Sequence, residues 1–185
     1  MNKKVRWVTE TAVMLALLVT LQSLTKPMGQ LVTGSCVNTV LAVTALVAGL
    51  GSGITVAIIS PVLAYLLGIA PQILTVPAIM AGNTVYVVLL SLMADRSGKN
   101  ILRQIIAWIA AALCKFVVLY VIVAKILCGV MAESLLAAGT LKPPMLNVLP
   151  ATFSWPQLVT ALIGGAIALL IAPVVVKALD RTAGE

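Results

Sequence analysis

The sequence has 185 residues, of which 62% are hydrophobic and only 9% are charged, with a mean hydropathy of +1.17. A soluble domain usually carries about a quarter charged residues, so this composition excludes a water-soluble fold. It predicts a single integral membrane domain over residues 1–185. The chain contains no His, which excludes His-dependent catalytic triads and His-ligated metal sites.

Other chemistries are excluded by spacing. Cys36, Cys114 and Cys128 stand singly within apolar stretches and fit neither a metal site nor a redox pair, so we expect them to pack as small hydrophobic residues. No phosphate-binding loop of the type G-x-x-x-x-G-K-[ST] occurs, so the chain is not predicted to hydrolyse ATP by itself. We therefore predict no catalytic residues, no metal and no cofactor.

Six segments are long and apolar enough to cross a hydrocarbon core, which requires about 20 residues per helix. They are, in chain order, residues 7–24, 31–50, 54–69, 76–93, 102–130 and 157–176. Residues 49–53 are predicted to form a tight turn. The third span is short and contains Pro61, which predicts a kink or a partial crossing, and the fifth is long enough to tilt or to project. The expected fold is an all-α bundle of six transmembrane helices.

Basic residues predict the orientation of this bundle, since cytoplasmic segments carry an excess of Lys and Arg. Six spans place both termini on one side. Eight basic residues fall on that side and three on the other. The eight are Lys3, Lys4, Arg6, Arg96, Lys99, Arg103, Lys177 and Arg181; the three are Lys26, Lys125 and Lys142. Both termini are therefore predicted to be cytoplasmic. The net charge of +7 is read as this topology signal, so no nucleic-acid partner is expected.

The three outer connections, residues 25–30, 70–75 and 131–156, hold six of the nine prolines. The last of them is apolar and contains Phe153 and Trp155, where a solvated loop would be polar. Two interpretations remain open for it. It is either an ordinary extracellular loop or a structured cap over a cavity.

Lys115 lies deep within the fifth span, twelve residues after Arg103. That distance is about 18 Å along a helix, slightly past the membrane midplane. A Lys at this depth costs about 2.5 kcal/mol or more, and none of the five acidic residues offers an obvious partner there. Lys115 therefore either binds an anionic or carbonyl-rich ligand, or is a structural residue that reaches water or helix carbonyls.

Amide side chains fall at similar depths. Asn38 and Asn83 each lie seven residues into a span, about 10 Å below the outer surface, while Gln22 ends the first span and Gln157 begins the sixth. Singly, such amides are usually satisfied by bonds between helices, but together they favour a cavity open to the outside. Aromatic side chains could stack on a ligand or anchor the chain at the membrane interface. The candidate substrate-binding residues are Lys115, Asn38, Asn83, Gln22, Gln157, Trp155 and Tyr86.

Small residues mark two helix faces where close approach is possible. Ala12 and Ala16 lie one turn apart on the first span. The sixth span has a similar face, formed by Ala161, Gly164, Gly165 and Ala168.

Taken together, these features resemble those of the substrate-binding S-components of energy-coupling factor (ECF) transporters, which are a vitamin-uptake branch of the ABC transporters. Among the S-components, the chain is similar to a bacterial subgroup. The resemblance covers nearly the whole chain, with six spans and the Ala12–Ala16 pair on the first of them. The segments that carry it are Val32-Thr33-Gly34 to Val37-Asn38, Met80-Ala81-Gly82-Asn83, Leu113-Cys114-Lys115-Phe116, and Phe153 with Pro156-Gln157-Leu158 to Gly164-Gly165.

The resemblance implies a protein of the bacterial plasma membrane that binds a vitamin or related small nutrient and is not an enzyme. Its pocket would lie in the outer half of the membrane under the outer loops. Ala12 and Ala16 would face a transmembrane coupling subunit, which works with two ABC ATPases. In this family the S-component topples in the membrane to deliver its ligand inward.

Two other classes remain open at this point. A scaffold protein of the cell-shape machinery has a similar six-helix fold, but it would not need Lys115, Asn38 and Asn83 around a cavity. A small secondary transporter would need an ion-coupling group, and the usual membrane Asp or Glu is missing.

Overall fold

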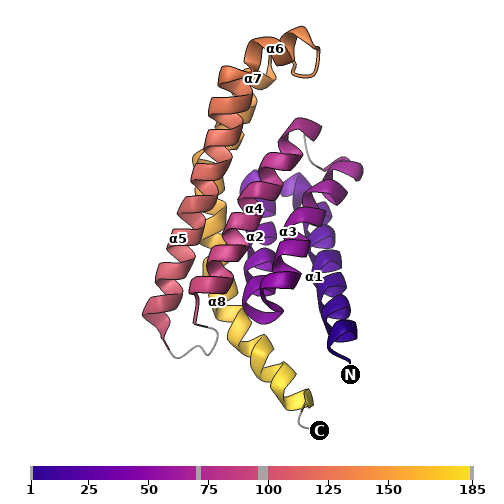
Figure 1. Ribbon diagram of the computed structural model, residues 1–185, viewed down its shortest axis with the longest axis vertical. Coiled ribbons are helices and arrows are strands. Elements are labelled where there is room, and N and C mark those ends of the chain that lie inside the picture. The colour runs from indigo at the N-terminus through magenta and orange to yellow at the C-terminus, as the bar shows by residue number, and fades with distance from the viewer. Residues whose placement is uncertain (1, 70–71, 96–99, 184–185) are drawn as a thin grey trace.

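The computed structural model describes residues 2–69, 72–95 and 100–183, which form helices and no strand (Figure 1). The long helices are α1 (Lys3–Thr25), α2 (Gln30–Val47), α3 (Gly49–Leu66), α4 (Val76–Met93), α5 (Ile101–Leu119) and α8 (Trp155–Ala183). The shorter ones are η1 (Lys26–Met28), η2 (Ile73–Thr75), η3 (Tyr120–Val130), α6 (Ala132–Ala137) and α7 (Met145–Thr152). Arg96, Lys99 and the first two residues of the 70–75 connection lie outside the described residues.

Six of the helical segments among the described residues are long and apolar enough to cross a membrane, so the predicted all-α fold with six spanning helices is confirmed. The predicted turn over residues 49–53 is wrong beyond its first residue. Gly49, with a φ of 87°, makes the turn, and α3 begins there. Gly53 lies inside α3 and is buried against the side chain of Val87. That glycine serves close helix packing, where any side chain would collide.

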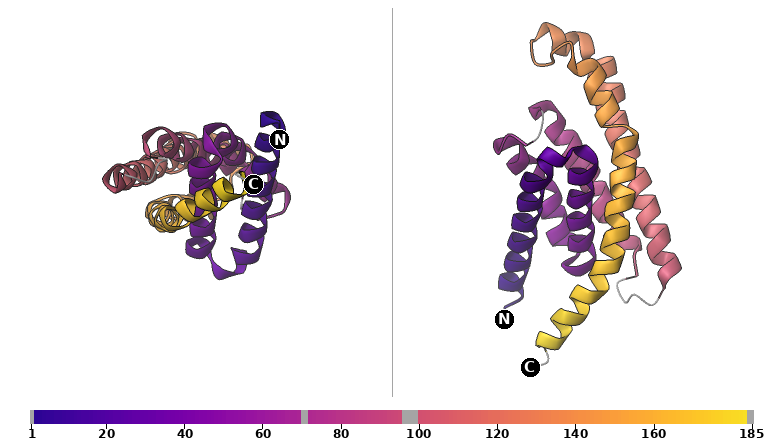
Figure 2. Two further views of the ribbon diagram at one scale, coloured as in Figure 1. Left: turned by 90° about the horizontal axis from the view of Figure 1, so that it is seen from below. Right: turned by 180° about the vertical axis from the view of Figure 1, so that it is seen from behind.

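The helices form two groups of different length (Figures 1 and 2). α1 to α4 make a shorter group, whereas the helical segments that contain α5 and α8 extend well past them, through η3 and α7, at the end of the molecule away from both termini. There α5 continues without a break as η3, a π-helix, so that one helical segment spans Ile101–Val130. The fifth span therefore projects beyond its neighbours, which is one of the two outcomes predicted from its length.

The connection predicted over residues 131–156 is largely helical and joins the projecting end of η3 to α8. α6 and α7 fold back between η3 and α8, and their apolar side chains form a small core with α4 and α5. The buried members of this outer core are Ala78, Leu119, Val123, Leu141, Leu149 and Phe153. This segment is thus structured by its own apolar residues, which fits the structured alternative of the two interpretations and not the ordinary loop.

A close approach between α2 and α8 helps to position the site. Gly34 of α2 faces Thr160, and Gly164 of α8 faces Asn38, such that a Cβ on Gly164 would lie 2.6 Å from the Asn38 Cβ. The same Cβ would meet the α2 backbone at the carbonyl oxygen of Ser35, 2.7 Å away. Glycine at these positions therefore allows the polar side chains of α2 and α8 to meet in the interior.

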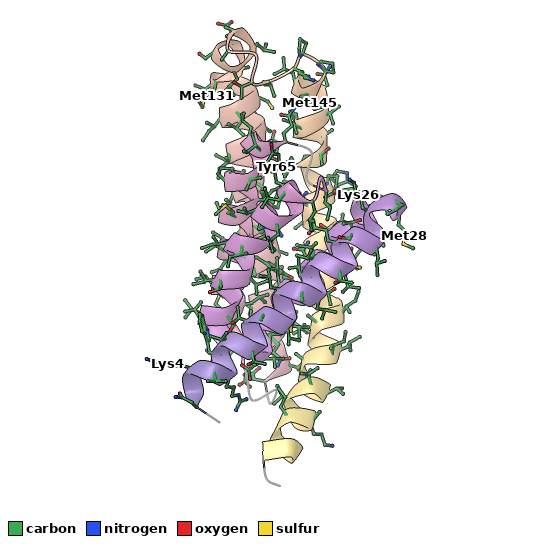
Figure 3. All side chains as sticks on the ribbon, turned by 90° about the vertical axis from the view of Figure 1, so that its right-hand side faces the viewer. Lys4, Lys26, Met28, Tyr65, Met131 and Met145 are labelled. Carbon is green, nitrogen blue, oxygen red and sulfur yellow. The ribbon has the colours of Figure 1, made fainter. Side chains whose placement is uncertain are left out.

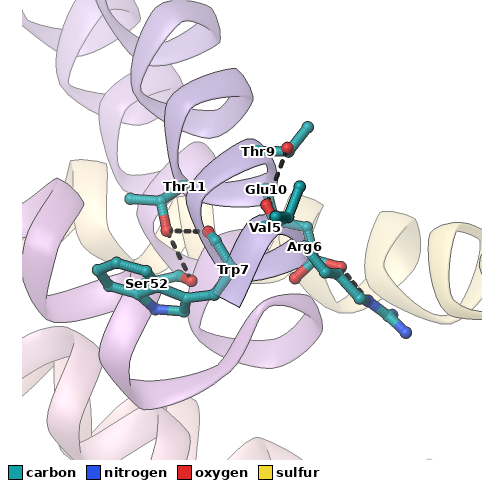
Figure 4. A network of polar contacts seen from close by, with 7 residues as sticks. All are labelled: Val5, Arg6, Trp7, Thr9, Glu10, Thr11 and Ser52. Carbon is teal, nitrogen blue, oxygen red and sulfur yellow. Dashed lines mark hydrogen bonds and ion pairs between the residues drawn. The ribbon is translucent and has the colours of Figure 1, made fainter. Parts of the chain in front are cut away.

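α1 lies across one side of the bundle, with Lys4 and Lys26 near its two ends (Figure 3). Near its beginning, α1 is tied to α3 by a hydrogen bond of 2.9 Å between the Thr11 and Ser52 hydroxyls (Figure 4). Both of these side chains are buried. Most of the remaining surface of α1 is exposed, including the large apolar side chains of Val13 and Leu17.

Candidate functional site

A cavity of about 170 Å³ lies in the half of the bundle away from the termini, between α2, α3, α4, α5 and the junction of α7 with α8. Its mouth is formed by the connection between α1 and α2, at Lys26, Gly29 and Gln30. Its floor is formed by Asn38 and Lys115, together with Asn83. Asn38 lies eight residues into α2, so the floor is about 12 Å below the start of that helix.

Lys115 is the centre of the floor and is 3% exposed. Its Nζ donates hydrogen bonds to the Oδ1 atoms of Asn38, at 2.5 Å, and of Asn83, at 2.7 Å. Three helices, α2, α4 and α5, therefore meet at one ammonium group. Buried polar groups require such partners, and bonds from a charged donor are among the stronger ones.

A second set of bonds connects this floor to α8. The Nδ2 group of Asn38 donates to the Thr160 hydroxyl at 3.2 Å, and that hydroxyl donates to the backbone carbonyl of Gln157 at 3.1 Å. The amide of Asn38 is thus held at both ends, with its oxygen toward Lys115 and its nitrogen toward α8. Its orientation is fixed before any ligand arrives.

Tyr86 supports the floor from below rather than lining the cavity. It is fully buried, and its ring centroid lies 5.3 Å from the Lys115 Nζ, within the range of a cation–π contact. Its hydroxyl donates to the Ala161 carbonyl at 3.1 Å, which fixes the ring against α8. Lys115 is therefore stabilised by two amide oxygens and one aromatic face.

The charges that line the cavity are positive. Lys26 and Lys115 contribute side chains to it, and no acidic side chain does so among the described residues. Lys26 donates from Nζ to the Gly68 carbonyl at 2.5 Å, which joins the connection after α1 to the end of α3 at the mouth. The described part of the cavity therefore presents two cations without a carboxylate.

Apolar side chains line the wall between floor and mouth. Leu119 lies one turn beyond Lys115 on α5, and Ile79 lies one turn before Asn83 on α4. Phe153, at the junction of α7 with α8, closes the same wall and packs in the outer core with Leu119. The lining thus offers a buried positive charge, amides and apolar contacts, which together suit the binding of a small molecule.

A family model described as "ECF transporter, substrate-specific component" matches residues 6–176. This chain belongs to that family. The resemblance predicted from the sequence is thereby confirmed, and it is favoured over a scaffold protein or a secondary transporter. Neither the curated proteins nor the solved structures gave a match to the chain. The protein is a multi-pass membrane component of an ECF transporter, and membership implies association with a coupling subunit and ATPases.

The S-component's predicted substrate-binding residues fall into two groups in the structure. Those that line the cavity are Lys115, Asn38, Asn83, Gln22 and Gln157. Those that do not are Tyr86, which lies beneath Lys115, and Trp155, which is 68% exposed and borders a shallower groove between α2 and α8. The polar side chains named for their depth thus lie around one space, whereas the two rings lie outside it.

Sequence reasoning missed several residues that line the cavity of this S-component. The mouth residues Lys26 and Gln30, together with Thr33 and Ser60 of α2 and α3, were not among the candidates. Lys26 carried a signal, because it was a basic residue in a short connection on the side with few basic residues. Thr33 lies in a segment that carries the resemblance, but neither it nor Ser60 carried a signal of ligand contact, since small hydroxyl residues are common in membrane helices and usually bond to their own helix.

Ala12 and Ala16 are both exposed on α1 and do not line the cavity. Their neighbours Val13 and Leu17 are 58% and 44% exposed. The S-component therefore presents an apolar face of α1 that no other described part of the chain covers.

Proposed function

We propose that this S-component captures a vitamin or a related small nutrient in the cavity and delivers it inward with a coupling subunit and two ABC ATPases. The observation that carries this proposal is the buried ammonium of Lys115 at the cavity floor, between the oxygens of Asn38 and Asn83. The S-component family supplies the transport context. Binding, and no covalent chemistry, is the expected role of the chain.

We place the cavity on the outer side of the bacterial plasma membrane and both termini in the cytoplasm. The support is the distribution of basic residues, of which eight fall on the side of the termini and three on the other side. The cavity lies in the half of the bundle away from the termini. In this orientation its mouth, at Lys26 and Gln30, faces the external medium where a scarce nutrient is found.

Within the site, Lys115, Asn38 and Asn83 are proposed to contact the substrate, with Gln22 and Gln157 as further polar contacts at the cavity wall. Tyr86 is proposed to hold Lys115 in place through its ring face, since it touches the ammonium but not the cavity. Trp155 is assigned the alternative role of an anchor at the membrane interface, because its ring is exposed.

The exposed face of α1 around Ala12 and Ala16 is proposed to dock on the coupling subunit. Small residues one turn apart let two helix backbones approach closely. Toppling of the S-component against that subunit would then move the cavity from the outside toward the cytoplasm.

The test is purification of the chain with a coupling subunit and two ABC ATPases, followed by extraction and mass spectrometry of any bound small molecule. The identified molecule is then offered, radiolabelled, to proteoliposomes that contain the complex. We expect ATP-dependent accumulation with the complex and none when α1 carries Ala16→Trp. A folded complex that neither retains a small molecule nor accumulates one would contradict the proposed function.

A further inference from the structure

The cavity floor holds the ammonium of Lys115, which no acidic side chain among the described residues neutralises. Both hydrogen-bond acceptors of the Lys115 ammonium are neutral amide oxygens, and its third neighbour is the face of the Tyr86 ring. Arg6 and Glu10 form an ion pair on α1, away from this floor (Figure 4). A buried cation is best compensated by an opposite charge, and here neutral dipoles take that place.

The partners of Lys115 leave room for such a charge. An ammonium has three N–H donors, and two of them are used by Asn38 and Asn83. Among the described residues, the Nδ2 group of Asn83 has no hydrogen-bond partner of its own. Lys115 and Asn83 both line the cavity. One ammonium hydrogen and one amide NH₂ group are thus available to an acceptor that enters the cavity.

The rest of the cavity suits an apolar molecular body. Between floor and mouth the wall is formed by Ile79, Leu119 and Phe153, each about one turn or more from the floor. Further out, Lys26 is exposed and already bonded to the Gly68 carbonyl. A solvated surface Lys discriminates little between charged and neutral ligands, whereas a buried one discriminates strongly.

We propose that the substrate carries a carboxylate that binds Lys115 and Asn83 at the cavity floor, with its apolar body along Ile79, Leu119 and Phe153. This inference rests on the proposed function and names the chemical class of its substrate. A carboxylate matches the single buried ammonium in charge and offers oxygens to both free donors. A phosphate, which carries nearly two negative charges, would leave charge uncompensated at this floor.

The test uses pairs of small nutrients that share a body and differ at one group. The carboxylates are nicotinate, pantothenate, biotin and lipoate; their neutral partners are nicotinamide, pantothenol, biotin amide and lipoamide. Thermal unfolding of the detergent-purified S-component is followed with each compound at millimolar concentration. We expect at least one carboxylate to raise the unfolding temperature, with its neutral partner binding roughly ten- to a hundred-fold more weakly.

Three variants then locate the charge that discriminates. Lys115→Met should abolish the preference for the carboxylate. Lys26→Met, at the mouth of the cavity, should retain the preference for the carboxylate over its neutral partner, because that side chain is solvated. Lys142→Met, an exposed Lys of the α6–α7 connection that does not line the cavity, is the matched control and should behave as the parent.

Several results would overturn the inference. One is equal stabilisation of the protein by carboxylate and neutral partner. Another is that no carboxylate stabilises it, whether or not pyridoxal phosphate does. A third is a preference for the carboxylate that survives in Lys115→Met and is lost in Lys26→Met. A neutral molecule identified in the purified transport complex would overturn only the inference that the substrate carries a carboxylate. In that case the proposed substrate-binding function would stand.

Discussion

The contact between α2 and α8 and the exposed face of α1 carry the same sequence pattern and have opposite surroundings. On α8, the space beside Gly164 is occupied by the side chain of Asn38 and the backbone of α2. On α1, Ala12 and Ala16 are exposed, and the described chain covers neither. Small residues at helical spacing therefore mark a close approach in both regions, one made within the chain and one left open for another molecule.

The two regions also differ in polarity. The interior contact brings together Asn38 and Thr160, which are hydrogen-bonded to each other. Asn38 also accepts a hydrogen bond from Lys115. The face of α1 offers apolar side chains, and its buried hydroxyl, Thr11, is used to hold α1 on α3. Selectivity for a ligand is thus expected from the first region and association with a partner from the second. The variants below separate these two roles.

The largest expected effect is on assembly. Ala12→Trp or Ala16→Trp places an indole on the exposed face of α1, where it prevents close approach of a partner helix. Co-purification with the coupling subunit should be lost, while the stability of the isolated chain changes by no more than about 0.5 kcal/mol. Leu170→Trp, at a position of α8 that is 77% exposed, is the control and should assemble normally. Normal assembly of both Ala variants would remove this face from docking.

The next effect is on folding and compares two glycines. Gly164→Ala would place a methyl group 2.7 Å from the Ser35 carbonyl oxygen, and overpacking of this kind costs about 1–3 kcal/mol. Gly129→Ala, whose Cβ would meet nothing nearer than 3.6 Å, should be neutral or stabilising. The measurement is the unfolding temperature of each purified variant. If the two temperatures agree, the contact between α2 and α8 is less tight than described.

A smaller effect is expected from the amides of the floor. Asn38→Ala removes acceptor and donor bonds to Lys115 and Thr160, whereas Asn83→Ala removes only an acceptor from Lys115. At about 1 kcal/mol per bond, Asn38→Ala should destabilise the ligand-free chain more than Asn83→Ala does. For affinity the order should reverse, since Asn83 has the free NH₂ group. Chemical or thermal unfolding and ligand titration of both variants decide this order.

The smallest effects are expected at Tyr86 and Trp155, the two aromatic residues predicted to bind the substrate. Tyr86→Phe keeps the ring beneath Lys115 and removes one hydrogen bond to Ala161, which should cost about 1 kcal/mol of stability and leave affinity unchanged. Trp155→Ala should change neither quantity by more than about 0.5 kcal/mol, because the ring is exposed. A large loss of affinity in either variant would show that the ring contacts the substrate.

Much of this architecture follows from the sequence. Hydropathy predicts six spans because a membrane helix has to be apolar over a fixed length, and the long fifth span is predicted for the same reason. The turn near Gly49 was extended too far, since glycines that serve close packing look the same in a sequence as glycines that make a turn. The helices of residues 131–156 were missed because both are short and one of them contains Pro150, so neither has a distinct pattern.

The site could be predicted residue by residue but not as an arrangement. The depth of Lys115, Asn38 and Asn83 follows from counting residues along each span. That Lys115 bonds to both amides depends on which faces of α2, α4 and α5 meet. Glycine packing sets part of this arrangement, through Gly34 and Gly164 between α2 and α8 and through Gly82 against Leu119 between α4 and α5. Such packing is not encoded in the periodicity of any single helix.

The most direct test of the central claim, that the floor around Lys115 binds the substrate, does not require the identity of that substrate. The parent, Lys115→Met and Lys142→Met are purified from cells under identical mild conditions, and native mass spectrometry measures the fraction of each that retains a small molecule. The account predicts retention in the parent and in Lys142→Met, and roughly ten- to a hundred-fold weaker binding, hence loss of the adduct, in Lys115→Met. The same adduct at the same occupancy in a folded Lys115→Met protein would contradict it.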